Sequence, residues 1–600
     1  MGKIHTVIES DVLVVGGAGA GVMSAVRSSQ AGASVTLVSK GKVGKSGNTI
    51  MIGGGFGIDG DGAREIVGMG DANPEYTREA AFKKLVYSGF FLGDQRLQKA
   101  FVDFGPYGVR DCLEWVKHAG QLFFYNARGC SWRTSGAAFG NTVKQGIKEH
   151  PEIAVYEDVL IAELLKKGDA VCGVLGIDIY TGEFIQFNAK AVILATGGFQ
   201  PFSIKNSHSD MTGDGIGLAL RAGARAVDME FLLFIGTILE PVYARGSILP
   251  FLFSIPALFS LRPRMRDLDG EELVFPPDDK YKVGPTNGKV NKLLMAEFYG
   301  RGIYKKMKKY GNAFYYDYSA YSDDDIRQAF LNYAESQSQL HRRGWYNGTD
   351  LVRLGEDIIG NGKRLKVTFG NEYSMGGVVV EPDFSTGVPG LYAAGEVSGG
   401  TFGAFRSGDG LTEMLAHGYA AGRSAAEYAA SHEQLAADDG EEKAEKILEP
   451  FRRTSGLSPV EARRVLEKIC DEGFDFYRDG ERLARAYDEI VKLRKNLKDL
   501  YVPGEDRRYN LEWINAEQVK NLAICAEIGI YGALNRRESR GTHLRADYPE
   551  VNNRDYLFNH TAALEGEKIL YGKQTPRADY LPPVKENYPG VVDFLAAQVL

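Results

Sequence analysis

The sequence is poor in cysteine, which excludes a cysteine-held metal cluster and a disulfide framework. Its 600 residues include five cysteines, and no two of them form a C-x-x-C pair. Iron–sulfur clusters need several closely spaced cysteine ligands, and disulfide scaffolds need a dense set of cysteines. We therefore predict no metal site in the chain. The five residues are Cys112, Cys130, Cys172, Cys470 and Cys525.

Long apolar runs are also missing, and so is an excess of positive charge. Residues 249–261 are apolar, but they are too few to cross a bilayer and include two prolines. We predict no membrane span. The formal net charge of −7 gives no reason to expect a nucleic-acid partner. Because the first predicted strand lies close to Met1, we expect no signal peptide and a cytoplasmic location.

Glycine, in contrast, is concentrated after the first predicted strand. Residues 12–15 form a short apolar run typical of a strand buried on both faces. A small-residue turn follows, then a predicted helix at 22–31 and a second strand at 35–38. Glycines let the backbone approach a pyrophosphate, and the helix N-terminus offers free N–H groups. This order predicts a dinucleotide-binding unit. The turn consists of Gly16, Gly17, Ala18, Gly19, Ala20 and Gly21.

Two further glycine turns come later, at residues 195–198 and 393–395. The first ends another apolar, strand-like run, and both allow close approach of the backbone to a ligand. Several such turns together favour a large, flat, phosphate-bearing ligand, and FAD has those properties.

The character of the sequence changes along the chain, which predicts several domains. Residues 232–353 are rich in prolines, aromatics and charged helices, and we interpret them as an inserted domain. Residues 76–120 are predicted to be helical with a break at Gly105-Pro106, and residues 446–538 to form long amphipathic helices. The predicted boundaries are 1–231 and 354–432 for the two parts of the nucleotide domain, 232–353 for the insertion, 433–570 for a C-terminal domain and 571–600 for an extended tail.

The ordered motifs resemble one family over nearly the whole chain, the flavoprotein subunit of succinate dehydrogenase and fumarate reductase, which includes L-aspartate oxidase. The resemblance implies FAD, an α/β FAD-binding domain (Rossmann-like, of the glutathione-reductase type), an inserted α+β capping domain that moves, and a C-terminal helical domain. It also implies that a separate iron–sulfur subunit is the electron partner, through which the chain would lie at the inner face of a membrane. The matching segments are 16–21, 35–40, 195–198, 212–215, 228–231, 374–377, 390–396 and 538–541, followed by His543, Arg545 and Asp547.

The resemblance also predicts how FAD is held. Glu396 matches an acid that holds the ribityl chain in similar proteins. Where succinate dehydrogenases carry a histidine that bonds covalently to the flavin, this sequence offers Asn48 or Gly47. Neither is a nucleophile, so we predict non-covalent FAD. The predicted cofactor-binding residues are 16–21, Ser39, Lys40, Ser46, Gly47, Asn48, Thr49, Gly54, Gly55, Ala195, Thr196, Gly197, Gly198, Thr212, Asp214, Gly395, Glu396 and Arg406.

The family's dicarboxylate site is largely replaced. Histidines of the family motifs correspond here to Ile235, Glu372 and Phe402, and an asparagine to Phe405, whereas Arg406 is kept. The family's proton-delivering arginine corresponds to Asn287. A second carboxylate would lack partners at the apolar end, which is costly. Two alternatives remain open: Phe402 and Phe405 as plain core residues, and Arg406 as a partner of Glu372.

We therefore predict an FAD-dependent oxidoreductase that transfers a hydride between flavin N5 and a carbon of an unsaturated carboxylic acid or carbonyl compound. The alternatives are a true fumarate reductase or succinate dehydrogenase, an oxidase like L-aspartate oxidase, and an electron-relay or assembly subunit without its own substrate. The predicted catalytic residues are Arg406, Glu372, Tyr373, Lys292 and Arg301, and the predicted substrate-binding residues are Ile235, Phe402, Phe405 and Arg406.

Overall fold

The structure is a computed structural model of the chain. Among the residues that it describes, no helix is both long and apolar enough to cross a membrane. Those residues are 2–51, 55–205, 211–247, 261, 263–273, 296–297, 300–306, 309, 311–341, 345–346, 349–406, 410–437 and 439–598.

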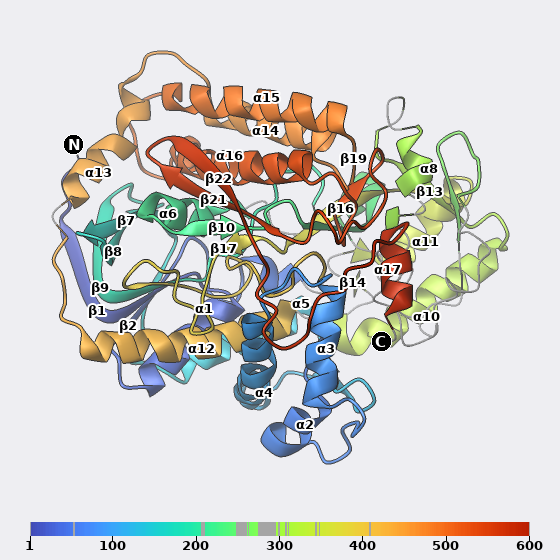
Figure 1. Ribbon diagram of the computed structural model, residues 1–600, viewed down its shortest axis with the longest axis horizontal. Coiled ribbons are helices and arrows are strands. Elements are labelled where there is room, and N and C mark those ends of the chain that lie inside the picture. The colour runs from blue at the N-terminus through green and yellow to red at the C-terminus, as the bar shows by residue number, and fades with distance from the viewer. Residues whose placement is uncertain are drawn as a thin grey trace.

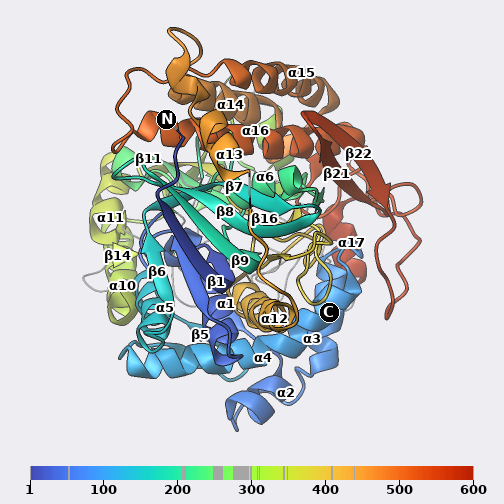
Figure 2. The same cartoon turned by 90° about the vertical axis from the view of Figure 1, so that its left-hand side faces the viewer.

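A seven-stranded sheet forms the centre of the nucleotide-binding part (Figures 1 and 2). Its strand order is β6-β2-β1-β9-β8-β7, with β18 also paired to β9. The first four strands and β18 are parallel, while β8 and β7 are antiparallel additions. The strands are β1 (Thr6–Val15), β2 (Val35–Ser39), β6 (Ala154–Glu157), β7 (Val159–Lys167), β8 (Ala170–Asp178), β9 (Phe184–Leu194) and β18 (Leu391–Ala393).

Two helices far apart in sequence pack side by side against this sheet, α1 (Gly19–Gln30) and α12 (Gly410–Ser431). The helix α4 (Gln95–His118) packs in turn on α12. The predicted break at Gly105-Pro106 is wrong, because α4 runs through Pro106. The ring fits because the neighbouring residue is Gly62, where a Cβ would lie 2.3 Å from Pro106 Cγ. Tertiary packing thus overrides the usual helix-breaking effect of proline.

The remaining elements before residue 232 lie outside the central sheet, and β10 belongs to a second sheet. They are η1 (Asn48–Met51), β3 (Gly55–Gly57), α2 (Gly60–Gly62), η2 (Ala63–Val67), α3 (Arg78–Ser88), β4 (Phe124–Asn126), β5 (Ser131–Arg133), α5 (Gly136–Lys148), α6 (Asp214–Ala222) and β10 (Arg225–Val227).

The inserted segment occupies the end of the molecule away from the central sheet (Figure 1). Its sheet has the order β11-β16-β13-β12 and is antiparallel. The strand β16 follows residue 353, the predicted end of the insertion, and connects this sheet to the nucleotide-binding part. The elements are β11 (Leu232–Glu240), η3 (Val242–Ala244), β12 (Arg264–Arg266), α8 (Gly300–Tyr304), β13 (Phe314–Asp317), α10 (Asp323–His341), β14 (Trp345–Tyr346), β15 (Thr349–Asp350), α11 (Leu351–Gly360) and β16 (Arg364–Ser374).

The C-terminal part contains the predicted long helices, which stack on one another above the central sheet (Figure 1). A four-stranded sheet, β17-β10-β21-β22, joins this part to the nucleotide-binding part. The elements are β17 (Gly377–Val378), α13 (Gly440–Ile447), η7 (Glu449–Arg452), α14 (Pro459–Gly473), β19 (Tyr477–Arg478), α15 (Gly480–Asn496), η8 (Leu497–Asp499), α16 (Leu511–Asn535), β20 (Leu544–Arg545), β21 (Asn559–Glu565), β22 (Lys568–Gln574) and α17 (Val591–Ala597).

The predicted extended tail, residues 571–600, is extended only in part. Residues 591–597 form α17, and Phe594 is fully buried in a stack with Phe90 at 4.4 Å between ring centroids. The large apolar residues of α17 are buried in the core. The proline-rich composition of the tail did not indicate this helix.

A buried ionic network ties the C-terminal part to the segment that precedes β11. Arg536 Nε donates to Glu230 Oε1 at 2.9 Å, and its Nη1 donates to Glu538 Oε1 at 3.0 Å. Arg540 contacts the same carboxylate of Glu538, and His560 contacts Glu230. These side chains are almost fully buried. Each charge is therefore stabilised mainly by its partners, so the network makes the relative position of the two parts specific.

Replacement of Arg536 by leucine should destabilise the protein strongly. The change leaves Glu230 and Glu538 short of a cation in the core, which costs about 3–5 kcal/mol for a buried pair. The measurement is denaturant unfolding followed by intrinsic fluorescence. The control is Arg508→Leu, because Arg508 pairs with Asp506 at the surface, where no measurable loss is expected. An equal effect of both variants would contradict the role of the network.

Candidate active site

Three segments meet at the first glycine turn, and they approach so closely that only glycine fits there. Gly16 has φ +126°, and a Cβ there would lie 2.2 Å from the carbonyl oxygen of Ala195. A Cβ at Gly21 would lie 1.8 Å from the carbonyl oxygen of Gly16. The ends of β1 and β9 and the start of α1 therefore pack backbone against backbone, and Gly17 packs closely against Ser39.

The other predicted turns meet at the same end of the sheet. Gly395 has φ +78°, and a Cβ there would lie 2.9 Å from Ala20 Cβ. The N-terminus of α1 has no acidic residue in its first turn and no side-chain cap at Ala18. The Gly19 N–H donates to Thr49 Oγ1 at 3.2 Å. Residues 16–21 and Gly395, here called the glycine cradle, therefore surround a helix N-terminus without acidic residues, which suits a pyrophosphate.

Two buried polar side chains beside this cradle, Thr196 and Glu396, could serve a bound cofactor. Thr196 Oγ1 is buried without a hydrogen-bond partner among the residues described. Glu396 accepts hydrogen bonds from the Ser374 N–H at 3.1 Å and from Asn48 Nδ2 at 3.4 Å. Burial raises the pKa of Glu396 to about 7. Such groups fit a cofactor that brings its own hydroxyls, as the ribityl chain of FAD does.

The remaining predicted cofactor residues lie at the edges of this region. Lys40 Nζ donates to Asp214 Oδ2 at 2.7 Å and to Thr212 Oγ1 at 3.1 Å, which holds these three side chains together at the edge of the cradle.

Most of the other predicted cofactor residues lie in loops and turns. Ser46 donates to the carbonyl oxygen of Lys42 in the same loop. Gly197 and Gly47 adopt positive φ, Gly198 packs against Glu396, and Gly55 lies within β3. Gly54 lies outside the described residues.

A cation–aromatic stack is the centre of the predicted substrate site. The Arg406 guanidinium carbon lies 4.0 Å from the centroid of the Tyr373 ring. Arg406 Nη2 lies 3.9 Å from Glu372 Oε2, and Arg406 Nε has no hydrogen-bond partner within the described part of the chain. Glu372, Tyr373 and Arg406 are thus brought together. The pairing of Arg406 with Glu372, left open by the sequence, is present.

A local irregularity of β16 sets the direction of these side chains. Leu233 pairs with Tyr373 and Phe234 with Asn371, so Glu372 is skipped in the register with β11. Such a bulge sends two successive side chains toward one side of a strand, and bulges are frequent next to active sites. The bulge explains how neighbouring residues of one strand, Glu372 and Tyr373, both contact Arg406.

Sequence analysis missed a member of this cluster, Glu413 in the first turn of α12. Its Oε2 is hydrogen-bonded to the Tyr373 hydroxyl, and both side chains are buried. Burial raises the pKa of Glu413 to about 8, against the opposing effects of Tyr373 and Arg406. A single acid among apolar residues at the start of a buried helix, seven residues after Arg406, was a usable signal.

The predicted apolar end of the site is made of buried side chains. Phe402 packs edge-to-face on Phe101 at 5.9 Å and on Tyr373 at 6.3 Å between ring centroids. Phe405 is almost fully buried, and Ile235 is buried in β11 opposite Gly370. Phe402 therefore touches the Arg406 cluster through Tyr373, while Ile235 lies further along the same pair of strands.

One predicted catalytic residue, Arg301, has partners outside the Arg406 cluster. Arg301 in α8 donates to Glu297 Oε1 at 2.7 Å and also interacts with Tyr477, which belongs to the C-terminal part. These partners differ from those of the Arg406 cluster. Lys292 lies outside the described residues.

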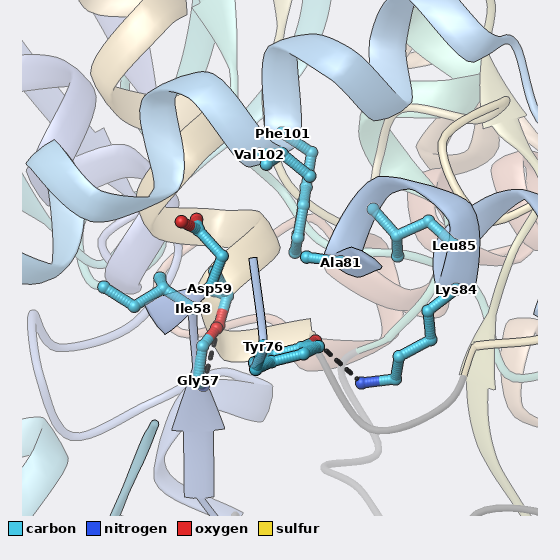
Figure 3. A pocket seen from close by; sticks show the side chains of 10 residues that line it. Gly57, Ile58, Asp59, Tyr76, Ala81, Lys84, Leu85, Phe101 and Val102 are labelled. Carbon is cyan, nitrogen blue, oxygen red and sulfur yellow. Dashed lines mark hydrogen bonds between the residues drawn. The ribbon is translucent and has the colours of Figure 1, made fainter. Parts of the chain in front are cut away.

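A small pocket is lined in part by Phe101 of α4 and Thr412 of α12 (Figure 3). Lys84 Nζ donates to the Tyr76 hydroxyl at 3.0 Å on one wall, and Asp59 Oδ2 is buried without a hydrogen-bond partner among the described residues. Through Phe101 the pocket adjoins Phe402, the apolar end of the site. It is lined by Gly57, Ile58, Asp59, Tyr76, Ala81, Lys84, Leu85, Phe101, Val102 and Thr412.

Two known protein families match the sequence. The family described as "FAD binding domain" matches residues 11–412, and the one described as "Fumarate reductase flavoprotein C-term" matches residues 463–588. The first match alone covers more than half of the chain and includes the glycine cradle, Arg406 and Tyr373.

Relatives with curated names match along nearly their whole length. A subunit of a "Fumarate reductase (CoM/CoB)" from Methanothermobacter marburgensis is 28% identical, over 90% of this chain and 95% of the relative. A "Fumarate reductase flavoprotein subunit" from Mycobacterium tuberculosis is 26% identical, over 97% and 98%. An "L-aspartate oxidase" from Streptomyces coelicolor is 26% identical, over 97% and 96%.

Solved structures share the fold. Sdh1 of Mycobacterium smegmatis, in complex with UQ1, superposes with a TM-score of 0.78 at 24% identity, over 95% of this chain and 94% of that one. An Escherichia coli quinol fumarate reductase superposes with a TM-score of 0.77 at 22% identity, over 97% and 99%. The predicted FAD-binding fold with a C-terminal helical domain is thereby confirmed. The chain is an FAD-dependent oxidoreductase and belongs to the succinate dehydrogenase and fumarate reductase flavoprotein family.

Proposed function

We propose that the protein reduces or forms a carbon–carbon double bond next to a single carboxylate or carbonyl group, and that fumarate and succinate are not its substrates. The observation that carries this proposal is the setting of Arg406. It is a buried cation held on the face of Tyr373, and its Nε has no partner among the described residues. Phe402 packs on the edge of the Tyr373 ring and adds an apolar surface to the site.

Arg406 is suited to hold the substrate's oxygen atoms. Its planar guanidinium presents donors in a fixed fork, which fits a carboxylate in a way that lysine cannot. Stacking on Tyr373 and burial restrict its rotamers, so little entropy is lost when the substrate binds. When bound, FAD supplies the hydride-transfer chemistry, and the protein orients the substrate and supplies charge.

The charges around Arg406 argue against a second carboxylate on the substrate. Glu372 already lies 3.9 Å from the guanidinium. Phe402, which packs on the edge of the Tyr373 ring, and Phe405, which precedes Arg406 in the chain, cannot donate hydrogen bonds. A dicarboxylate would leave one charged end desolvated and unpaired, which is costly. An apolar or aromatic body attached to one carboxylate or carbonyl fits better.

We further propose that electrons pass through a separate iron–sulfur subunit. The sequence has five scattered cysteines and no cluster motif, so a cluster would come from a partner. The relatives from Methanothermobacter marburgensis and Mycobacterium tuberculosis are both named as subunits, which supports an assembly. In this proposal the chain is cytoplasmic and reaches the inner face of a membrane only through a partner.

FAD should be released from the protein by acid. The loop that carries a bonding histidine in succinate dehydrogenases has Gly47 and Asn48 here, and Asn48 donates to Glu396 instead. After acid precipitation we expect a colourless pellet and a yellow supernatant, measured by absorbance. A pellet that keeps its flavin fluorescence after washing would show a covalent bond.

Fumarate should be a poor substrate. Its distal carboxylate would face Phe402 and Phe405 without a donor. The measurement is reoxidation of the photoreduced holoenzyme by fumarate and, as the comparison, by the monocarboxylate crotonate. Turnover of fumarate at rates usual for enzymes, about 1–10³ per second, would refute the proposed specificity.

Arg406→Lys should impair turnover while FAD content and the melting temperature stay the same. Lysine keeps the charge but loses the fork, which removes about 1.5–3 kcal/mol of transition-state stabilisation as a lower kcat/KM. The control is Arg266→Lys, since Arg266 pairs with Asp317 in the inserted sheet and should not affect kinetics. If Arg406 only pairs with Glu372 for stability, Arg406→Lys and Glu372→Gln will instead lower melting temperature and FAD content together.

A further inference from the structure

We propose that Tyr373 and Glu413 form the proton relay of this site, with Tyr373 protonating the substrate carbon and Glu413 replacing the proton on the tyrosine. This inference rests on the proposed function and adds a residue, Glu413, to its machinery. In the reductive direction every hydride added to a double bond must be matched by one proton, and the site must hold that proton away from bulk water.

The geometry provides a continuous path. The Tyr373 hydroxyl is hydrogen-bonded to Glu413 Oε2, and the Tyr373 ring lies under the Arg406 guanidinium at 4.0 Å. Tyr373, Arg406 and Glu413 are 6%, 8% and 2% exposed. A substrate held by Arg406 would therefore lie beside the phenol, with the carboxyl behind it and shielded from solvent.

The protonation states match the two roles. Burial raises the pKa of Glu413 to about 8, so the carboxyl carries a proton at pH 7 and can donate it to the phenol oxygen. Burial also raises the pKa of Tyr373 well above its usual value, with Glu413 and Glu396 contributing in the same direction. The phenol therefore stays protonated and can act as the acid.

The charged neighbours of Glu413 have opposite effects on its pKa. Arg406 favours its ionised form, whereas Glu396 disfavours it. Arg406 is the group that would compensate the charge left on Glu413 after the proton has moved. Glu372 is less suited to this role because it lies in an ion pair with Arg406, which needs the ionised carboxylate, and its side chain is 22% exposed.

The transfer balances in atoms and charge. The O–H bond of Tyr373 breaks as a C–H bond forms at one carbon of the double bond, while the other carbon receives the hydride that reduced FAD supplies. The O–H bond of Glu413 breaks as that of Tyr373 forms again. The product has gained two hydrogens, Tyr373 is unchanged, and Glu413 is left as a carboxylate next to Arg406.

The direct test is infrared spectroscopy of the FAD holoenzyme as a function of pH. We expect a protonated-carboxyl carbonyl band that is lost as the pH rises through about 8, because burial shifts the pKa of the Glu413 carboxyl there. The band should be missing from the difference spectrum of Glu413→Gln and shifted in Tyr373→Phe, which removes its hydrogen-bond partner. An unchanged spectrum in Glu413→Gln would overturn the relay. Glu527→Gln is the matched control, a buried glutamate that accepts from Tyr571 at 3.2 Å away from the site.

Kinetics with crotonate provide the second measurement. Both Glu413→Gln and Tyr373→Phe should lower kcat about 10²-fold or more at pH 7, as loss of a general acid does. The wild type should lose activity above pH 8 because Glu413 is then ionised, whereas Glu413→Gln should lack this step. Normal turnover by either variant would overturn the relay. If neither the wild type nor the variants reduce crotonate but the Glu413 carboxyl band titrates as expected, the proposed substrate class is wrong. The proposed protonation of Glu413 would then still stand.

Discussion

The stack of Arg406 on Tyr373 is the interaction on which the rest of the site depends. It fixes a cation that can hold one oxygen-bearing end of a substrate, and it sets the phenol of Tyr373 next to the same place. Two distant segments supply it, β16 through its bulge and the residues before α12. The central sheet and the α1–α12 packing therefore act as the scaffold that brings these segments together.

Electrostatics then determine what the site can accept. One buried arginine faces Glu372, and Glu396 and Glu413 lie within its influence. Burial raises the pKa values of Glu396 and Glu413 to about 7 and about 8, which limits the number of negative charges that Arg406 must compensate. Arg406 keeps a free Nε donor in the described structure. A balance of this kind suits a ligand with a single negative or carbonyl end.

Local patterns made much of the fold predictable. The first strand, turn and helix follow from an apolar run and a glycine turn, and the structure explains the glycines by contacts that no Cβ would allow. Long-range packing was not predictable in the same way. Pro106 lies inside α4, where Gly62 leaves room for its ring, and α17 packs on the core through the stack of Phe594 on Phe90. Both contacts join residues that are far apart in sequence.

The same distinction applies to the candidate site. Arg406, Glu372 and Tyr373 could be predicted from motifs. The sequence marks Glu413 only as a lone acid in an apolar helix, and its hydrogen bond to Tyr373 appears only when β16 and α12 are seen together. Arg301 donates to Glu297, a contact that no local pattern indicated, and its catalytic role stays a prediction. The most direct test of the account is ligand binding to the oxidised holoenzyme, followed by perturbation of the flavin absorbance. The account predicts that crotonate binds, that Arg406→Lys weakens its binding, and that fumarate binds far more weakly than crotonate. Tighter binding of fumarate than of crotonate would contradict it.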